Sequence, residues 1–215
     1  MKPLLKIMGA ITLFFACTFL AVKLTNSITI EKITSWLTIA QHTSPQAIGF
    51  IVIGFLFADL FIAIPTLTIT TLSGYFLGFQ NGAIAAFIGM FLAGIGGYGL
   101  SMLLGDRLLK TLIKKPHERE RAKKSFHKHG FIMILLSRAV PILPEVTACI
   151  AGSTNMPFQK FLLAWTLSTL PFALIASFAG SISTLENPKP AVITTIAVSA
   201  LLWIGWYVFN KKSEK

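Results

Sequence analysis

The sequence predicts an all-α integral membrane protein with about four transmembrane helices. Two re-entrant helical hairpins, entering from opposite faces, are expected to form an inverted repeat. Of its 215 residues 54% are hydrophobic and only 13% are charged, against roughly 25% charged in an average globular domain. Several apolar stretches approach or exceed the roughly 20 residues that a bilayer-spanning helix needs. The apolar stretch 130–157 nevertheless holds an arginine and two closely spaced prolines near its middle, which an ordinary membrane helix would not.

The positive charge is concentrated in one part of the chain. The formal net charge is +11, and nine Lys and Arg residues lie between Arg107 and Lys128. This segment separates two apolar stretches, which is typical of the positive-inside bias. We therefore expect residues 105–129 to form a cytoplasmic loop with some attraction to anionic headgroups. No nucleic-acid recognition motif accompanies the charge, so binding to nucleic acid is not expected.

The N-terminal region, residues 1–45, is expected to hold one membrane helix and one short helix. Residues 7–22 are apolar and flanked by lysines. No small-residue cleavage motif follows, which favours an uncleaved helix with its N-terminus in the cytoplasm. Residues 28–40 carry apolar side chains at helical spacing and include Trp36. This pattern predicts an amphipathic helix at the outer interface, and a helix packed on the domain is an equal alternative.

The membrane domain is expected over residues 46–182. It starts with an apolar block, 46–80, that is interrupted at Pro65 and followed by Asn81-Gly82. Residues 83–104 form an uninterrupted span in which small residues recur every four positions. Such a row lets another backbone approach closely within a membrane. Its members are Ala85, Gly89, Ala93, Gly97, Ser101 and Gly105.

Two further spans complete the predicted set. Residues 157–180 form one, and residues 191–209 form the other within the C-terminal region 183–215. The last span ends in tryptophan and tyrosine residues and is followed by lysines. This arrangement places the C-terminus, like the N-terminus, in the cytoplasm.

The hairpins follow from counting membrane crossings. The basic segment and the C-terminus lie on the same side, and the spans 157–180 and 191–209 already provide an even number of crossings between them. Residues 130–156 are too short for two more spans of about 20 residues each, so they must enter and return. The same count before the basic segment leaves none or two crossings for 46–80. Its second limb after Pro65 is only 15 residues long, so a second hairpin that turns near this proline fits better than two full spans. In transporters, an inverted repeat of this kind places the substrate site near the bilayer midplane.

Three ionisable residues lie inside the predicted hairpins, where charge is costly and usually functional. Arg138 would suit a lipid phosphate, or would form an ion pair with Asp59 or Glu145 that holds the hairpins together. Glu145 would carry a proton or cap the following half-helix. Asp59 has Arg138 as its candidate partner. The predicted hairpin turns involve Pro65, Pro141, Pro144 and Gly152.

Other kinds of chemistry are not expected. Hydroxyl groups after Pro65 either line a polar path or bond back to their own helix. Cys17 and Cys149 lack metal-ligand or redox spacing and are interpreted as packing residues. The glycine-rich run 94–99 lies in a span with no preceding strand, which rules out a dinucleotide loop. We therefore expect no enzyme activity, no metal and no cofactor. The hydroxyl-bearing residues are Thr66, Thr68, Thr70, Thr71 and Ser73.

A set of positions in both hairpins follows a known family pattern. In the second half they are Gly130, Arg138, Pro141, Ala151-Gly152, Met156-Pro157-Phe158, Phe161 and Gly180. In the first half they are Pro65, Ser73-Gly74, Gly78 and Gly82. Over about residues 46–182 the chain thus resembles the DedA superfamily of VTT-domain (SNARE-associated) membrane proteins. Many members carry a second arginine six residues after the first, where this chain has Pro144 and then Glu145; in this it resembles the yeast-Golgi-protein-like branch.

The resemblance implies two opposed re-entrant hairpins and movement of lipids between leaflets, in bacteria often dependent on the proton gradient. The leading hypothesis is a translocase or scramblase for phospholipid or polyprenyl-phosphate headgroups in a bacterial inner membrane, with Arg138 engaging the phosphate. One alternative is an ion-coupled transporter of a small solute that uses Asp59 and Glu145. Another is a non-catalytic protein of envelope assembly or trafficking. The expected partners are membrane lipids, with a coupling proton or cation and a homo-oligomer as further options.

Overall fold

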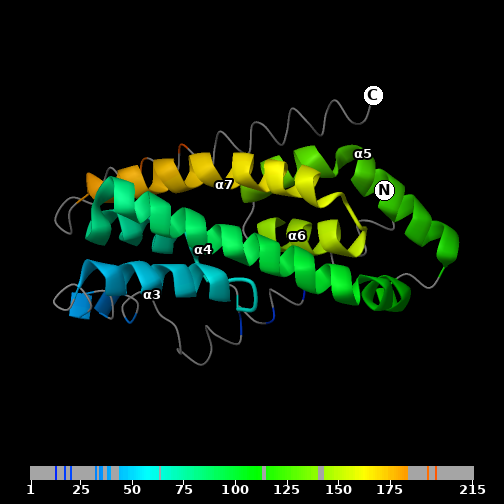
Figure 1. Ribbon diagram of the computed structural model, residues 1–215, viewed down its shortest axis with the longest axis horizontal. Coiled ribbons are helices and arrows are strands. Elements are labelled where there is room, and N and C mark those ends of the chain that lie inside the picture. The colour runs from blue at the N-terminus through cyan, green and yellow to red at the C-terminus, as the bar shows by residue number, and fades with distance from the viewer. Residues whose placement is uncertain are drawn as a thin grey trace.

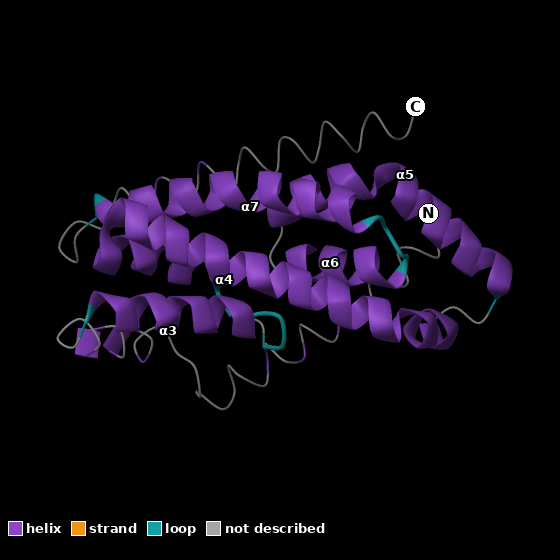
Figure 2. Ribbon diagram, viewed as in Figure 1, coloured by secondary structure: helices purple, strands orange, loops and turns teal. Residues whose placement is uncertain are grey.

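The computed structural model describes residues 44–62, 64–112, 115–139 and 143–183, with a few isolated positions elsewhere. All elements within these ranges are helical, as expected for the predicted class (Figures 1 and 2). The helices predicted at 7–22, 28–40 and 191–209 lie outside the described ranges. The elements are α3 (Pro45–Ala58), α4 (Thr66–Leu112), α5 (Pro116–Leu136), the 3₁₀ turn η1 (Ser137–Ala139), α6 (Leu143–Ser153) and α7 (Phe158–Ser181).

Two of these helices have the length and hydropathy of membrane spans. One is the Thr66–Leu104 part of α4 and the other is α7. The first contains the predicted span 83–104, and the second matches the predicted span 157–180 to within one residue at each end. Two shorter apolar helices accompany them, α3 and the Phe126–Leu136 part of α5. The described chain is therefore a helical protein with two helices suited to cross a bilayer.

Helix α4 is kinked at Gly78. This residue has φ 75° and ψ 172°, a backbone conformation that glycine adopts at little cost and other residues avoid. The kink divides α4 into a first part up to Leu77 and a second part from Phe79 onward. The sequence pattern predicts the boundary between the apolar block 46–80 and the span 83–104 a few residues later, at Asn81-Gly82.

The basic segment 105–129, predicted to connect two spans as a loop, is mostly helical. α4 continues to Leu112, and α5 begins at Pro116, a position where proline is favoured because its missing N–H needs no partner. Lys, Arg and Glu are good helix formers, and a run of them does not by itself interrupt a helix. Several of these side chains in α5, including Arg121, Lys124 and Lys128, are exposed.

The small-residue row of α4 packs against two different helices. Gly89 lies against Ile53 and Leu56 of α3. Gly97 lies against Ala148 of α6 and against Leu60, which follows the end of α3. Figure 1 shows α4 running between α3, which lies below it in this view, and α6 and α7, which lie above it. The small-residue row thus contacts α3 from the first predicted hairpin and α6 from the second.

Glycines also bring helix backbones into direct contact at two crossings. A Cβ at Gly74 of α4 would collide with the backbone of Ser177 in α7, and one at Gly180 would collide with the backbone of Thr71. A Cβ at Gly152 of α6 would collide with the carbonyl of Tyr98. The sequence predicts Gly152 as part of a hairpin turn, but the residue lies inside α6, where it allows close packing. The turn follows it, at 154–157, where Asn155 has φ 54°.

Candidate functional site

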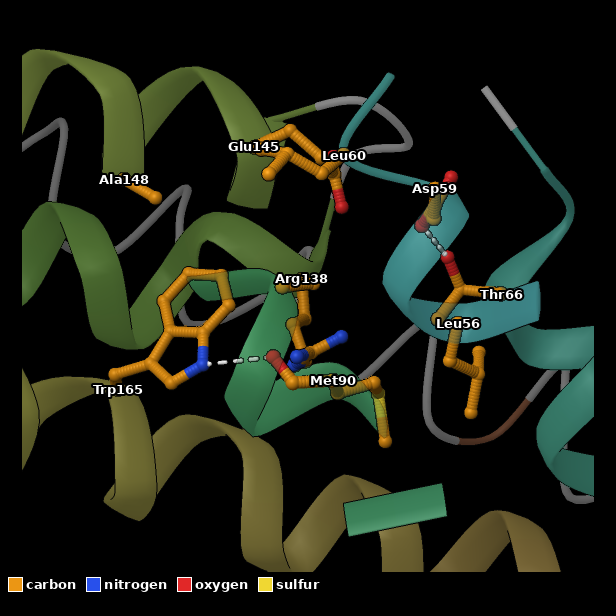
Figure 3. Close-up of a pocket in the computed structure, with 10 residues that line it drawn as sticks. Leu56, Asp59, Leu60, Thr66, Met90, Arg138, Glu145, Ala148 and Trp165 are labelled. Carbon is orange, nitrogen blue, oxygen red and sulfur yellow. Dashed lines mark hydrogen bonds between the residues drawn. The ribbon is translucent and has the colours of Figure 1, made fainter. Parts of the chain in front are cut away.

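Two interruptions of the helical structure face each other across a small cavity. The first lies between α3 and α4, and the second lies between η1 and α6. Figure 3 shows the side chains that surround the cavity. Its lining includes all three ionisable residues that the sequence singled out. The lining residues are Leu56, Asp59, Leu60, Thr66, Met90, Ala93, Arg138, Glu145, Ala148 and Trp165.

The cavity is small and mostly enclosed. Its volume is about 10 Å³, which is about the space that one water molecule requires. A phosphate group does not fit into it. The structure therefore represents a closed arrangement of the two interruptions. The space between Asp59, Arg138 and Glu145 is only large enough for one water molecule.

Asp59 holds the first interruption in shape. It is 5% exposed and is the C-cap residue of α3. Its carboxylate accepts a hydrogen bond of 2.7 Å from the backbone N–H of Ile64 and one of 2.6 Å from the hydroxyl of Thr66. Pro65, which lies between these two partners, has no N–H to donate. The carboxylate thus connects the end of α3 to the start of α4 across the predicted break.

Replacing Asp59 by alanine is expected to destabilise the protein more than replacing it by asparagine. Alanine leaves the Ile64 N–H without its partner, whereas asparagine keeps one acceptor oxygen. Hydrogen bonds to charged groups contribute about 1.5–3 kcal/mol each, so we expect a loss of about 3 kcal/mol for alanine. Thermal unfolding in detergent measures this, with Thr66→Val as the control that removes one of the two bonds. Equal stability of Asp59→Ala and wild type would contradict this role.

Arg138 lies in η1 at the second interruption. Its Nη2 donates a 3.0 Å hydrogen bond to the Thr169 hydroxyl. Its Cζ lies 5.5 Å from the ring centroid of Trp165 and 4.9 Å from that of Phe172. Its Nε is buried and has no hydrogen-bond partner. A guanidinium has five N–H donors, so most of its donor capacity is not used by the side chains that the structure describes.

The two carboxyl groups lie near Arg138 without forming a close ion pair with it. Asp59 and Glu145 interact electrostatically with each other and with Arg138. The hydrogen bond and ring contacts of Arg138, however, all involve residues of α7. Within the described part of the chain, these three residues therefore form a looser cluster of ionisable groups and no close ion pair.

Glu145 lies in the first turn of α6 and lines the cavity. The helix N-terminus favours a negative charge there, and the cavity gives the carboxyl group access to Arg138 and Asp59. Its position is therefore compatible with both predicted roles, helix capping and proton carriage. Pro144, predicted to mark a turn, is buried within the same first turn, and Pro141 lies outside the described residues.

The sequence did not single out the contribution of α7. Trp165, Thr169 and Phe172 recur at positions i, i+4 and i+7, which places them on one face of a helix. All three contact Arg138. A hydroxyl between two aromatic residues at this spacing is a usable signal, but other hydroxyl-bearing residues, such as Ser168, stand beside it in a mostly apolar segment.

The hydroxyl groups after Pro65 mostly bond to their own helix. Thr70 donates to the carbonyl of Thr66, Thr71 to that of Leu67, and Ser73 to that of Thr70. These contacts support the second of the two expectations, local bonding, for these residues. Thr66 differs from them because its hydroxyl bonds to Asp59 at the cavity.

Comparison with known proteins shows which family the chain belongs to. Residues 64–182 match the VTT domain. The chain is 27% identical over 198 residues to undecaprenyl phosphate transporter A of Bacillus subtilis (strain 168), covering 85% of this chain and 94% of that protein. It is 30% identical over 177 residues to an alkaline phosphatase-like protein of Lactococcus lactis subsp. cremoris (strain MG1363), covering 72% and 82%. An uncharacterized membrane protein of Buchnera aphidicola subsp. Schizaphis graminum (strain Sg) is 26% identical, covering 82% and 77%. No solved structure matches the chain.

Proposed function

Since this chain belongs to the VTT-domain family, also known as the DedA family, we propose that it moves lipids with phosphate headgroups across a bacterial membrane. The substrate class is polyprenyl phosphate or phospholipid. The similarity to an undecaprenyl phosphate transporter over most of both chains supports this class. We place the protein in the inner membrane, with both termini in the cytoplasm, and regard it as a transporter rather than an enzyme.

The observation that carries the proposal is the state of Arg138. Its guanidinium lies at the junction of two interrupted helices, with a buried Nε that has no partner and one hydrogen bond to a neutral hydroxyl. An arginine at membrane depth costs roughly 3 kcal/mol or more, so a position like this one is hard to explain by stability. A phosphate is an anion that arginine binds well, through paired, charge-assisted hydrogen bonds.

The arrangement of the helices supports a route for a headgroup. We propose that α3 with the first part of α4 forms one re-entrant hairpin, and that the apolar end of α5 with α6 forms the other. Each hairpin is followed by a span, the second part of α4 or α7. The second limb of each hairpin crosses the span of the other half at a glycine, Gly74 in one case and Gly152 in the other. This reciprocal packing is what an inverted repeat would produce.

Headgroup binding requires the cavity to open. At about 10 Å³ it holds no more than one water, so the two interruptions must separate before a phosphate reaches Arg138. Backbone that is not helical is tolerated at membrane depth when it lines a cavity, and it offers a place where such a movement costs few hydrogen bonds. We propose that the lipid headgroup enters between the interruptions while its hydrocarbon chains stay in the bilayer.

Transport is the first test of this proposal. The purified protein is reconstituted in phosphatidylcholine vesicles that contain a fluorescent lipid with a phosphate headgroup, and its movement between leaflets is followed by quenching from outside. We expect faster movement than in empty vesicles, and little movement of a matched lipid whose headgroup lacks phosphate. Protein that moves neither lipid but takes up a small solute along an ion gradient would favour the alternative of a solute transporter.

We propose that the carboxyl groups of the cavity couple lipid movement to protons. We expect Glu145→Gln to keep downhill lipid movement within about threefold of wild type, because glutamine has nearly the same shape. The variant should no longer respond to an imposed proton gradient, since an amide does not exchange a proton as a buried carboxyl group does. Lipid movement in vesicles with and without a pH gradient measures this. A Glu145→Gln protein that responds to the gradient as wild type does would show that Glu145 is not the coupling group.

A further inference from the structure

The face of α7 that meets Arg138 is built differently from the other hydroxyl-bearing helix faces. The hydroxyls of Thr70, Thr71 and Thr154 donate to carbonyls four residues earlier in their own helices. The hydroxyl of Thr169 instead accepts the 3.0 Å hydrogen bond from Nη2 of Arg138. Thr169 is fully buried, so this hydrogen bond is shielded from bulk water. The contact therefore fixes one end of the guanidinium.

Trp165 forms a rigid wall beside the same guanidinium. Its indole N–H donates a 3.1 Å hydrogen bond to the carbonyl of Met90 in α4 (Figure 3). Its ring lies where a side chain on Gly94 would be and stacks on Phe161, with centroids 5.6 Å apart. These three contacts, with Met90, Gly94 and Phe161, restrict rotation of the indole when Arg138 moves.

Phe172 contacts the guanidinium as well, with its ring centroid 4.9 Å from Cζ, against 5.5 Å for Trp165. Arginine stacks on aromatic rings through its planar group, and lysine has no such plane. Two rings and one hydroxyl therefore determine how the guanidinium is oriented. The group left without a partner is Nε, and the residue that carries it lines the cavity.

We infer that Trp165, Thr169 and Phe172 form a clamp on α7 that orients Arg138 so that its free donors face the headgroup phosphate, with Thr169 as a positioning residue. This inference rests on the proposed function. It adds that η1 provides the positively charged side chain, whereas residues of α7 determine how its guanidinium is oriented. Preorganised donors bind an anion more tightly because less conformational freedom is lost on binding.

A purely structural role for Thr169 predicts different behaviour. If the hydroxyl only satisfied a buried donor, its removal would lower thermal stability and the amount of active protein, without changing the affinity of each molecule for lipid. If the hydroxyl orients Arg138, its removal weakens the apparent affinity for the phosphate lipid in protein that remains folded. The half-saturating lipid concentration separates these two cases.

The test compares three threonine variants in phosphatidylcholine vesicles with increasing amounts of a fluorescent polyprenyl phosphate. Thr169→Val keeps the shape and removes the acceptor, and Thr169→Ser restores it. Thr70→Val is the matched control, since Thr70 is equally buried and its hydroxyl bonds only within α4. We expect a roughly tenfold higher half-saturating concentration for Thr169→Val, in line with a hydrogen bond to a charged group. Thr169→Ser and Thr70→Val should stay within about twofold of wild type.

A second comparison keeps the inference testable if Thr169→Val folds poorly. Trp165→Phe retains an aromatic wall but weakens the cation–π contact, and we expect a two- to threefold higher half-saturating concentration. On an Arg138→Lys background both changes should have little further effect, because contacting residues are not additive. Wild-type values for Thr169→Val or Trp165→Phe would overturn the inference, as would full additivity with Arg138→Lys. If wild-type protein itself moves no phosphate lipid, it is the proposed function that fails.

Discussion

Replacing Arg138 by alanine is expected to slow the movement of phosphate lipids by about a hundredfold. The variant loses the charge that would face the phosphate, together with at least two charge-assisted hydrogen bonds of about 1.5–3 kcal/mol each. Lysine at this position keeps the charge but not the planar fork. We therefore expect Arg138→Lys to be slowed less, by about tenfold. Lipid movement in reconstituted vesicles measures both variants against wild type.

The control for this comparison removes a positive charge elsewhere. Lys124 is exposed on α5 and does not line the cavity, so Lys124→Ala should move lipid within about twofold of wild type. Thermal unfolding shows whether the Arg138 variants are folded. A folded Arg138→Ala protein that moves phosphate lipids at the rate of wild type would rule out headgroup binding by this residue.

The substitution of Gly74 by alanine is expected to lower the stability of the protein strongly. Helix propensity alone would favour alanine by about 1 kcal/mol. The added Cβ, however, collides with the backbone of Ser177, and backbone atoms of a packed helix cannot move aside as a flexible side chain can. Overpacking costs about 1–3 kcal/mol and occasionally more. We expect a net loss of about 2 kcal/mol, seen as a melting temperature lower by about 4–8 °C.

Two other glycines provide matched controls for this prediction. Cβ atoms at Gly54 and Gly99 would meet no other atom within 4 Å, so alanine there should leave the melting temperature unchanged or raise it slightly. The contrast between Gly74→Ala and these two variants isolates the helix crossing. A Gly74→Ala protein as stable as Gly99→Ala would mean that α4 and α7 do not pack backbone to backbone.

The ionisable residues of the site were predictable because charge is rare in apolar sequence. Asp59, Arg138 and Glu145 each stood alone among hydrophobic neighbours, and the structure brings them to one cavity. Their partners were not predictable in the same way. Thr169 and the aromatic residues beside it lie in a helix that carries apolar residues on every side, so hydrophobic periodicity does not reveal which face meets Arg138.

The differences between the predicted and the observed fold have local physical causes. The run of charges at 105–129 was interpreted as a loop, although Lys, Arg and Glu are compatible with the helices found there. Gly152 was interpreted as a turn, although the close approach of Tyr98 explains the glycine. Pro65, by contrast, marked the start of α4 correctly, since proline fixes the backbone and lacks a donor. A glycine alone does not tell whether it serves a turn or a close packing contact.

The central claim is that Arg138 binds the phosphate of a lipid headgroup, and lipid retention measures this most directly. The purified protein is offered equal amounts of a polyprenyl phosphate and the corresponding polyprenol, and the bound lipid is identified by native mass spectrometry. We predict that wild-type protein retains the phosphate form in clear excess, and that folded Arg138→Ala protein retains both forms equally. Equal retention by wild-type protein, or an undiminished preference in Arg138→Ala, would contradict the claim.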